Sequence, residues 1–305
     1  MLIPYSATQG YSTLLDRLSV AALAELDQLM ATVANEPPAV QQEALMDLLP
    51  TLGDQYVGAS SLVSAQFFTE LQEMNGVRKP VEAETLDGVG AKRWHALAGW
   101  GARSSIFEQG GAALVFSLLS GGMTKILTES SADTMIGNAA NQGSMRSQRV
   151  PRPGCCAFCG MLASRFAGYT SEQSAGKVGG RGKPISSNFR ADGTRKSGGQ
   201  AKGIRTRGSR AIGEDFHDHC RCRIVVVTEG NEAELQAGAD RYYDAYLEAS
   251  KKANAGLERN VLESMDAAGN RHNEYEWVTT EGDIASPKKR QSMIVAAMRE
   301  ELGVK

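Results

Sequence analysis

Two short clusters of cysteine and histidine restrict the folds open to this chain more than any other feature. The first is Cys156-x-x-Cys159 and the second is His217-x-x-Cys220-x-Cys222, so four of the five cysteines belong to them. A two-residue gap lets one tight turn present two ligands to the same ion, and tetrahedral zinc sites use thiolate and imidazole donors. The spacing therefore predicts that the two clusters converge on a zinc ion.

The predicted ligand set contains one candidate more than a tetrahedral ion needs. Cys156 and Cys159 supply two thiolates, and two further ligands come from His217, Cys220 and Cys222. Four protein ligands leave no position for water, so the ion would be structural and its binding would supply folding free energy. Two alternatives stay open. Buried cysteines also behave as small hydrophobic residues in a metal-free cluster, and Cys-x-x-Cys is also a disulfide or redox motif.

The segment between the two clusters is basic and rich in glycine. From Arg165 to Arg210 the sequence has 11 Lys or Arg residues against 2 Asp or Glu, whereas the whole chain carries a net charge of −2. Residues 168–211 have few large apolar side chains to offset chain entropy, so we expect a long mobile loop or a segment that orders on a partner. The charge predicts contacts with nucleic-acid phosphates, the alternatives being a solvated insert or one that docks on an acidic protein. The candidate phosphate contacts are Arg181, Lys183, Arg190, Arg195, Lys196, Lys202, Arg205, Arg207 and Arg210.

The first 145 residues predict a mainly helical domain, because their apolar residues recur at helical spacing. The predicted helices cover 12–35, 39–74, 92–127 and 129–143. Proline and glycine should end or interrupt them, and the expected breaks lie at Pro37-Pro38, near Pro50 and Gly53, at Gly110-Gly111 and at Gly121-Gly122. The leucine, methionine and aromatic stripes of these helices are interpreted as core.

Beyond residue 145 the pattern becomes a mixture of helix and strand. The predicted elements are an extended stretch over 148–154, a short helix beginning at Cys159, a strand over 222–227 and helices over 231–268 and 287–302. The predicted fold class is therefore α+β and predominantly α. Its expected parts are a helical N-terminal domain (1–145), a small α+β Cys/His module (146–229) that carries the basic loop 168–211, and a helical C-terminal arm (230–305).

Other motifs give weaker signals. The run from Leu86 to Lys92 resembles the phosphate-holding turn of a helix-hairpin-helix, but we interpret it as an ordinary glycine turn before a helix. The sequence has no His-Glu-x-x-His and no Gly-x-Ser-x-Gly, and Cys159 with His217 is a weak nucleophile and base pair, so no catalytic residue is predicted. The odd number of cysteines fits a reducing compartment. We expect no signal peptide and no membrane-spanning segment.

The two clusters with their flanking residues resemble the phage Mu F-like minor head proteins, in the branch found in phages of actinobacteria. The matching blocks run from Arg149 to Arg165 and from Phe216 to Cys222, and the resemblance covers about residues 147–228. The positions that correspond to the family pattern are Cys156, Cys159, His217, Cys220 and Cys222. Cys155 and His219 fall where that pattern is looser, and the basic loop is longer than the spacer of many relatives.

The resemblance implies a binding role in head morphogenesis. It predicts a minor capsid protein that docks on the portal protein or the major capsid shell, lies inside the virion after assembly in the host cytoplasm, and contacts packaged DNA through residues 165–210. It implies no small-molecule substrate and no membrane partner. Two other functions are kept as alternatives: a capsid maturation protease, and a zinc-dependent nucleic-acid-binding module.

Overall fold

A computed structural model places most of the chain and divides it into two compact units. It describes residues 5–142, 146–152, 155–164, 177–184, 204–211, 219, 221–265, 271–279, 281–283 and 287–304. The first unit consists of Met1–Arg152 with Phe166–Gln236, and the second of Pro153–Arg165 with Ala237–Lys305. Helix predominates among the described residues, as predicted. The three-part domain division stays a prediction.

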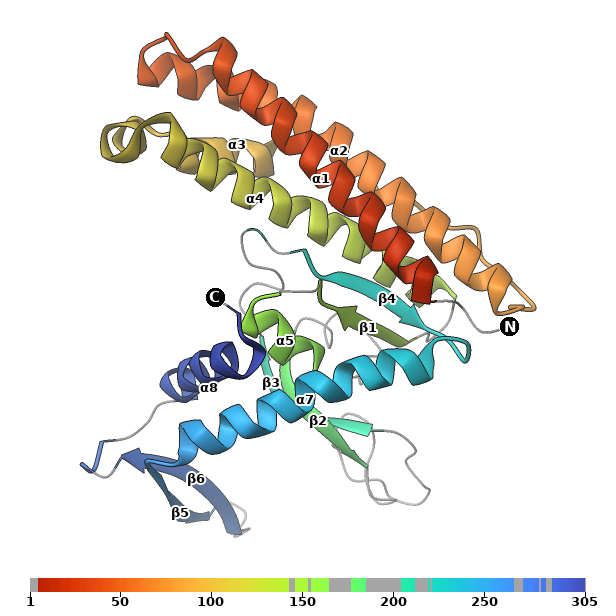
Figure 1. Cartoon of the computed structure of the whole chain (residues 1–305), viewed down its shortest axis with the longest axis vertical. Helices are drawn as coiled ribbons and strands as arrows, with labels where there is room; N and C mark the ends of the chain where they lie inside the picture. The colour runs from red at the N-terminus through yellow and green to blue at the C-terminus, as the bar shows by residue number, and fades with distance from the viewer. Residues whose placement is uncertain are drawn as a thin grey trace. The chain divides into compact units, whose positions relative to one another are not determined.

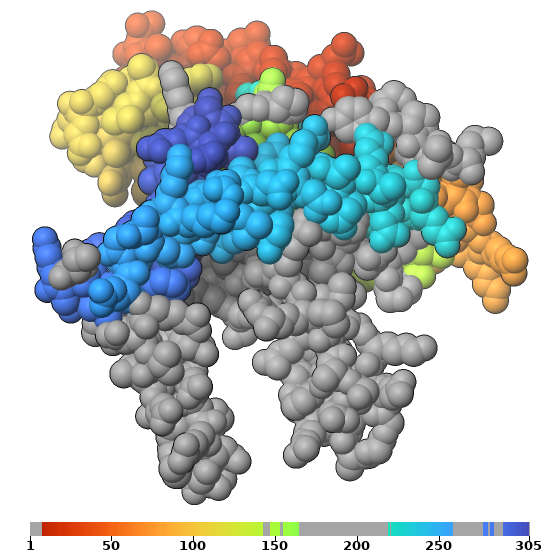
Figure 2. Space-filling model, turned by 60° about the horizontal axis from the view of Figure 1, so that its bottom comes forward, coloured from red at the N-terminus to blue at the C-terminus, as the bar shows by residue number. Residues whose placement is uncertain are grey.

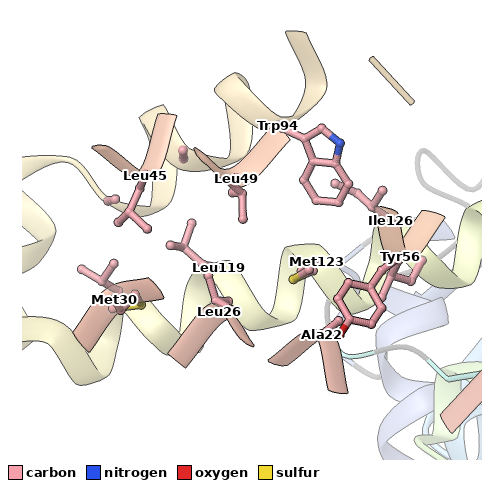
Figure 3. Packing of buried hydrophobic residues seen from close by; sticks show 14 of the residues in the cluster. Ala22, Leu26, Met30, Leu45, Leu49, Tyr56, Trp94, Leu119, Met123 and Ile126 are labelled. Carbon is pink, nitrogen blue, oxygen red and sulfur yellow. The ribbon is translucent and has the colours of Figure 1, made fainter. Parts of the chain in front are cut away.

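Four helices form the body of the first unit. They are α1 (Tyr5–Thr32), α2 (Pro38–Met74), α3 (Ala91–Gly101) and α4 (Ser104–Asn141), and the three long ones run side by side (Figure 1). Their buried leucines, such as Leu26, Leu49 and Leu119, point toward one another, and Trp94 of α3 joins the same cluster (Figure 3). Each buried leucine contributes about 1.5–3 kcal/mol, so this cluster is the main source of the unit's stability.

Helix α2 continues through Pro50, so the break predicted there is wrong. A proline inside a helix costs about 3 kcal/mol, because it removes a backbone donor and crowds the preceding turn. Leu45, Leu49 and Val57 are fully buried around it, and together they contribute more than that cost. Gly53 also stays helical. A side chain would not fit at this position, because the ring of Trp94 occupies the space where it would stand.

Helix α4 confirms one predicted glycine break and contradicts the other. Gly111 has φ 64° and ψ −164°, which kinks the helix, whereas Gly121 and Gly122 are buried inside a continuous helix. A Cβ at Gly122 would collide with Leu97 of α3, so this glycine permits close helix packing. Among the described residues, α4 alone is long and apolar enough to cross a membrane by length and composition, and half of its most apolar window is buried inside the structure.

An extended strap, residues 79–89, joins α2 to α3 and is held by side chains of α2 and α4. Asn138 forms two hydrogen bonds with Glu84, accepting from its N–H at 2.7 Å and donating to its carbonyl at 2.8 Å. Gln72 does the same with Val81, at 2.9 Å and 3.0 Å. These two amide side chains supply the strap with hydrogen bonds that a partner strand would otherwise provide, at Val81 and Glu84.

Two antiparallel strand pairs complete the first unit. Strands β1 (Arg146–Val150) and β4 (Arg223–Val227) pair with each other, and β4 packs on α4, which confirms the predicted strand. Strands β2 (Lys177–Pro184) and β3 (Ile204–Ala211) form a second pair. Within the expected loop 168–211, these sixteen residues therefore form strands, and their backbones pair with each other. The rest of that loop lies outside the described residues.

The second unit packs three helices around a small core. Helix α5 (Ala157–Ala163), helix α7 (Glu232–Asn254) and helix α8 (Pro287–Leu302) contribute Met161, Ala249 and Met298, and α7 and α8 lie side by side (Figure 2). The bounds of α8 match the prediction. The helix expected over 231–268 ends at Asn254, and strands β5 (Leu257–Met265) and β6 (Arg271–Thr279) follow as an antiparallel pair.

Candidate functional site

The first cysteine cluster stands at the start of α5. Cys156 is the residue before the helix, with an extended backbone at φ −66° and ψ 158°. Its Sγ accepts a hydrogen bond from the N–H of Cys159 at 3.4 Å. Cys159 is buried and Cys156 half-buried. The local fold thus places two thiols one helical turn apart, and the amide donor favours negative charge on the first sulfur, which is the form that binds a metal.

Contacts within the second unit hold α5 in place. Met161 packs with Met298 of α8 in the common core. A Cβ at Gly160 would lie 2.9 Å from Leu302 and 3.1 Å from Tyr242, so helices α7 and α8 approach this backbone closely. The thiol of Cys155 lies 3.8 Å from the hydroxyl of Tyr242, a hydrogen-bond contact involving sulfur. Cys155 is thereby directed to α7.

The second cluster is only partly described. Cys222 directly precedes β4 and is 1% exposed. His219 is exposed, and its N–H donates to the carbonyl of Gly121 in α4 at 3.2 Å. Its φ of 60° is rare for a residue other than glycine. His217 and Cys220 lie outside the described residues.

An ion pair between buried Arg223 and partly exposed Asp16 anchors β4 beside Cys222, and it was not predicted from the sequence. Arg223 is 2% exposed, and its Nη2 lies 2.8 Å from Oδ1 of Asp16 in α1. Its Nη1 is 3.5 Å from the hydroxyl of Thr128 in α4, and Arg152 Nε lies 3.6 Å from the other Asp16 oxygen. The available signal was an arginine at the head of an otherwise apolar strand. Such a charge needs a buried partner.

The donor chemistry of the predicted ligands fits zinc, and the described residues leave the complete set as a prediction. Among those residues, no group of three or more His, Cys, Asp or Glu side chains stands where it could hold a metal ion. Cys156 and Cys159 belong to the second unit, whereas Cys222 belongs to the first. The pair that starts α5 is therefore the part of the set that the fold itself brings together.

The predicted phosphate contacts concentrate on one strand pair. Arg181 and Lys183 lie on β2, and Arg205, Arg207 and Arg210 lie on β3. The pairing register sets Lys183 opposite Arg205, Gly180 opposite Arg207 and Val178 opposite Arg210. The fold thus gathers five of the nine candidates in one two-stranded ribbon. The other four, Arg190, Arg195, Lys196 and Lys202, lie outside the described residues.

The glycine turn before α3 binds a carboxylate from the protein itself. Asp54 of α2 accepts hydrogen bonds from the N–H of Val89 at 3.0 Å and from the indole Nε1 of Trp94 at 2.7 Å. A Cβ at Gly88 would lie 2.7 Å from the Asp54 carboxyl carbon. The amide that a helix-hairpin-helix would direct to a DNA phosphate is thus engaged by Asp54, which agrees with an ordinary turn.

Comparison with known proteins identifies the family but gives no individual relative. No curated protein and no solved structure matches the chain. The family of VG15 proteins matches residues 3–249, which span the four-helix body, both cysteine clusters and most of α7. Because this match covers well over half of the sequence, the chain belongs to the VG15 protein family, a phage-associated family of virion-gene proteins.

Proposed function

We propose that this chain is a minor component of the phage head that binds the portal protein or the inner capsid and contacts packaged DNA. The observation that carries the proposal is the concentration of positive charge on β2 and β3 in a member of a phage virion-gene family. Cations in a protein that is acidic elsewhere are suited to a polyanion, and DNA is the polyanion that fills a phage head.

DNA binding is tested with a charge-neutral variant and a control of equal charge. Replacing Arg181, Lys183, Arg205, Arg207 and Arg210 by glutamine removes five cations from the ribbon. The control variant replaces five exposed cations elsewhere, namely Arg17, Arg78, Lys92, Arg241 and Arg299. Each phosphate contact contributes about 0.9 to the slope of log K against log salt, so the ribbon variant should lose up to about 4.5 of that slope and the control little. Equal losses in both variants would refute a specific role of the ribbon.

The place in the virion is tested by composition and co-purification. We expect the intact chain in purified virions at few copies per particle, and in complexes recovered with tagged portal protein from infected cells. A chain found only in the host cell and never in particles would contradict the proposal. Recovery with the shell but not with the portal would select the inner capsid as its binding surface.

We also propose that zinc joins the two cysteine clusters. Cys156 and Cys159 would supply two ligands, and two of His217, Cys220 and Cys222 the others. The ion would supply folding free energy to a region that has little hydrophobic core. Full-length protein purified from zinc-supplied cells should contain one zinc per chain, and Cys159→Ser should lose it. Cys155→Ser is the matched control, because Cys155 contacts Tyr242, and it should keep the metal. Wild-type protein that purifies without zinc would refute this proposal.

A further inference from the structure

The β2–β3 ribbon has a composition that opposes its own pairing. Its two strands, KVGGRGKP and IRTRGSRA, carry six cationic residues and no acidic ones. They contain four glycines and a proline, which are depleted in strands because they weaken pairing or remove a donor. A two-stranded sheet without further strands or a hydrophobic face is at best marginally stable in water.

The register adds electrostatic repulsion. Lys183 and Arg205 are direct partners across the antiparallel pair. Like charges at directly opposed positions destabilise strand pairing, whereas opposite charges there stabilise it. The register also shifts between Val178 and Gly180 and between Gly180 and Lys183, so the ladder is interrupted twice. A polyanion that lies along the ribbon would remove the repulsion and supply the stabilisation that the strands lack.

We propose that duplex DNA is this polyanion, and that pairing of β2 with β3 is coupled to DNA binding. The inference rests on the proposed function. Each strand has eight residues and therefore spans roughly 26 Å at about 3.3 Å per residue. The major groove admits a two-stranded β-ribbon, and this length follows about three quarters of one helical turn. Single strands are less suited, because neither strand contains an aromatic residue on which a base could stack.

The coupling makes DNA binding independent of sequence and sensitive to salt. Contacts from lysine and arginine to phosphates position a protein without reading bases. Salt weakens those contacts, so it should also melt the ribbon in the complex. Packaged DNA has no single target sequence, and a ribbon that orders only on a duplex would suit such a ligand.

The test measures strand pairing and DNA affinity in the same full-length protein. Hydrogen exchange of amides in 177–184 and 204–211 is followed with and without a 30-base-pair duplex, at low and at high salt. In wild-type protein, the duplex should slow exchange at low salt only. The variant Lys183→Glu sets a carboxylate opposite Arg205, so the free ribbon should exchange about two- to five-fold more slowly. The same variant should bind DNA more weakly, because one phosphate contact is lost and one repulsion is gained.

The control is Lys92→Glu, which makes the same charge change at an exposed position at the start of α3. Lys92→Glu should leave hydrogen exchange in the ribbon unchanged, and it should lower DNA affinity only slightly. If Lys183→Glu weakens DNA binding but leaves ribbon exchange unchanged, the coupling is overturned while the proposed function stands. Failure of wild-type protein to bind any DNA would overturn both. Stronger protection by single-stranded DNA than by the duplex would overturn the choice of ligand.

Discussion

Substitution of Gly53 by alanine tests the packing that holds α2, α3 and α4 together. Gly53 lies in the interior of α2, directly against the indole ring of Trp94, which is completely buried. An alanine Cβ at this position would lie 2.6 Å from Cη2 of the ring and closer still to Cε2 and Cζ2. Real Cβ atoms essentially never approach so closely, so either the ring or the backbone has to move.

Movement of the ring is restricted, and this sets the size of the effect. Trp94 donates its Nε1 hydrogen to the carboxylate of Asp54, one residue after Gly53, at 2.7 Å. Overpacking of a core costs about 1–3 kcal/mol. If the ring escapes instead, it loses a hydrogen bond to a charged group, which costs about 1.5–3 kcal/mol. Alanine regains about 1 kcal/mol over glycine in a helix interior. After the gain from alanine is subtracted, either route leaves a net loss of up to about 2 kcal/mol in the free energy of unfolding.

Gly58→Ala is the matched control, because Gly58 lies in the same helix and its added Cβ would meet nothing within 4 Å. It should stabilise the protein by up to about 1 kcal/mol. Denaturant unfolding followed by circular dichroism measures both variants. A double variant with Trp94→Phe should recover about 0.5–3 kcal/mol relative to the sum of the single changes. Equal stabilities for Gly53→Ala and Gly58→Ala would refute the packing argument.

Three further predictions concern other parts of the fold. Burial, followed by the hydrogen bond to Glu25 at 2.7 Å, raises the pKa of Tyr56 from 10.0 to about 12. The neutral Tyr56 hydroxyl should therefore contribute its full stabilisation below pH 10, and this contribution should disappear between pH 10 and about 12. In a pH series of unfolding measurements, Tyr56→Phe should lack this pH-dependent loss of stability. Met298→Ala should cost about 2–5 kcal/mol in the second unit, because Met298 is fully buried between α5 and α7, whereas exposed Glu300→Ala should stay within about 0.5 kcal/mol. Asn138→Ala should cost about 1–3 kcal/mol and speed hydrogen exchange at Glu84, while exposed Asn141→Ala leaves that amide unchanged.

Helix positions could be predicted because apolar periodicity is a local property of the sequence. The bounds of α8 agree with the predicted 287–302, and the strand at β4 follows from its run of β-branched residues. The breaks predicted at Pro50 and Gly121-Gly122 were wrong, because the outcome there depends on tertiary packing and not on the local sequence. A proline or glycine indicates a local cost, whereas the gain that outweighs it comes from packing of the helix against the rest of the core. Leu45, Leu49 and Val57 are buried around Pro50, and Leu97 of α3 packs against Gly122. A proline or glycine therefore breaks a helix only where no tertiary packing compensates for its local cost, as at Gly111.

In the candidate site, too, contacts between residues close in the sequence could be predicted, whereas long-range contacts could not. The pairing of Cys156 with Cys159 could be predicted, because both residues belong to one turn of chain. The Asp16–Arg223 pair joins residues far apart in the sequence, and the sequence around Asp16 in α1 does not indicate that it pairs with a buried arginine. The same holds for Asp54 and the turn at Val89, where the acceptor for the backbone amide comes from another helix. Convergence of the two cysteine clusters would be a contact of this second, long-range kind, which is why metal content has to be measured.

The pairing of β2 with β3 could not be predicted from the composition of the segment. The scarcity of large apolar side chains in 168–211 argues against a hydrophobic core in this segment, but it does not argue against strands. Backbone pairing, however, requires only that donors and acceptors meet, and the alternation of Arg205 and Arg207 with small polar residues is compatible with a strand. With Lys183 opposite Arg205 and no acidic residue in either strand, we expect the pairing to draw its stabilisation from outside the strands. The charge that signals a polyanionic partner is thus also the reason why the ribbon needs one.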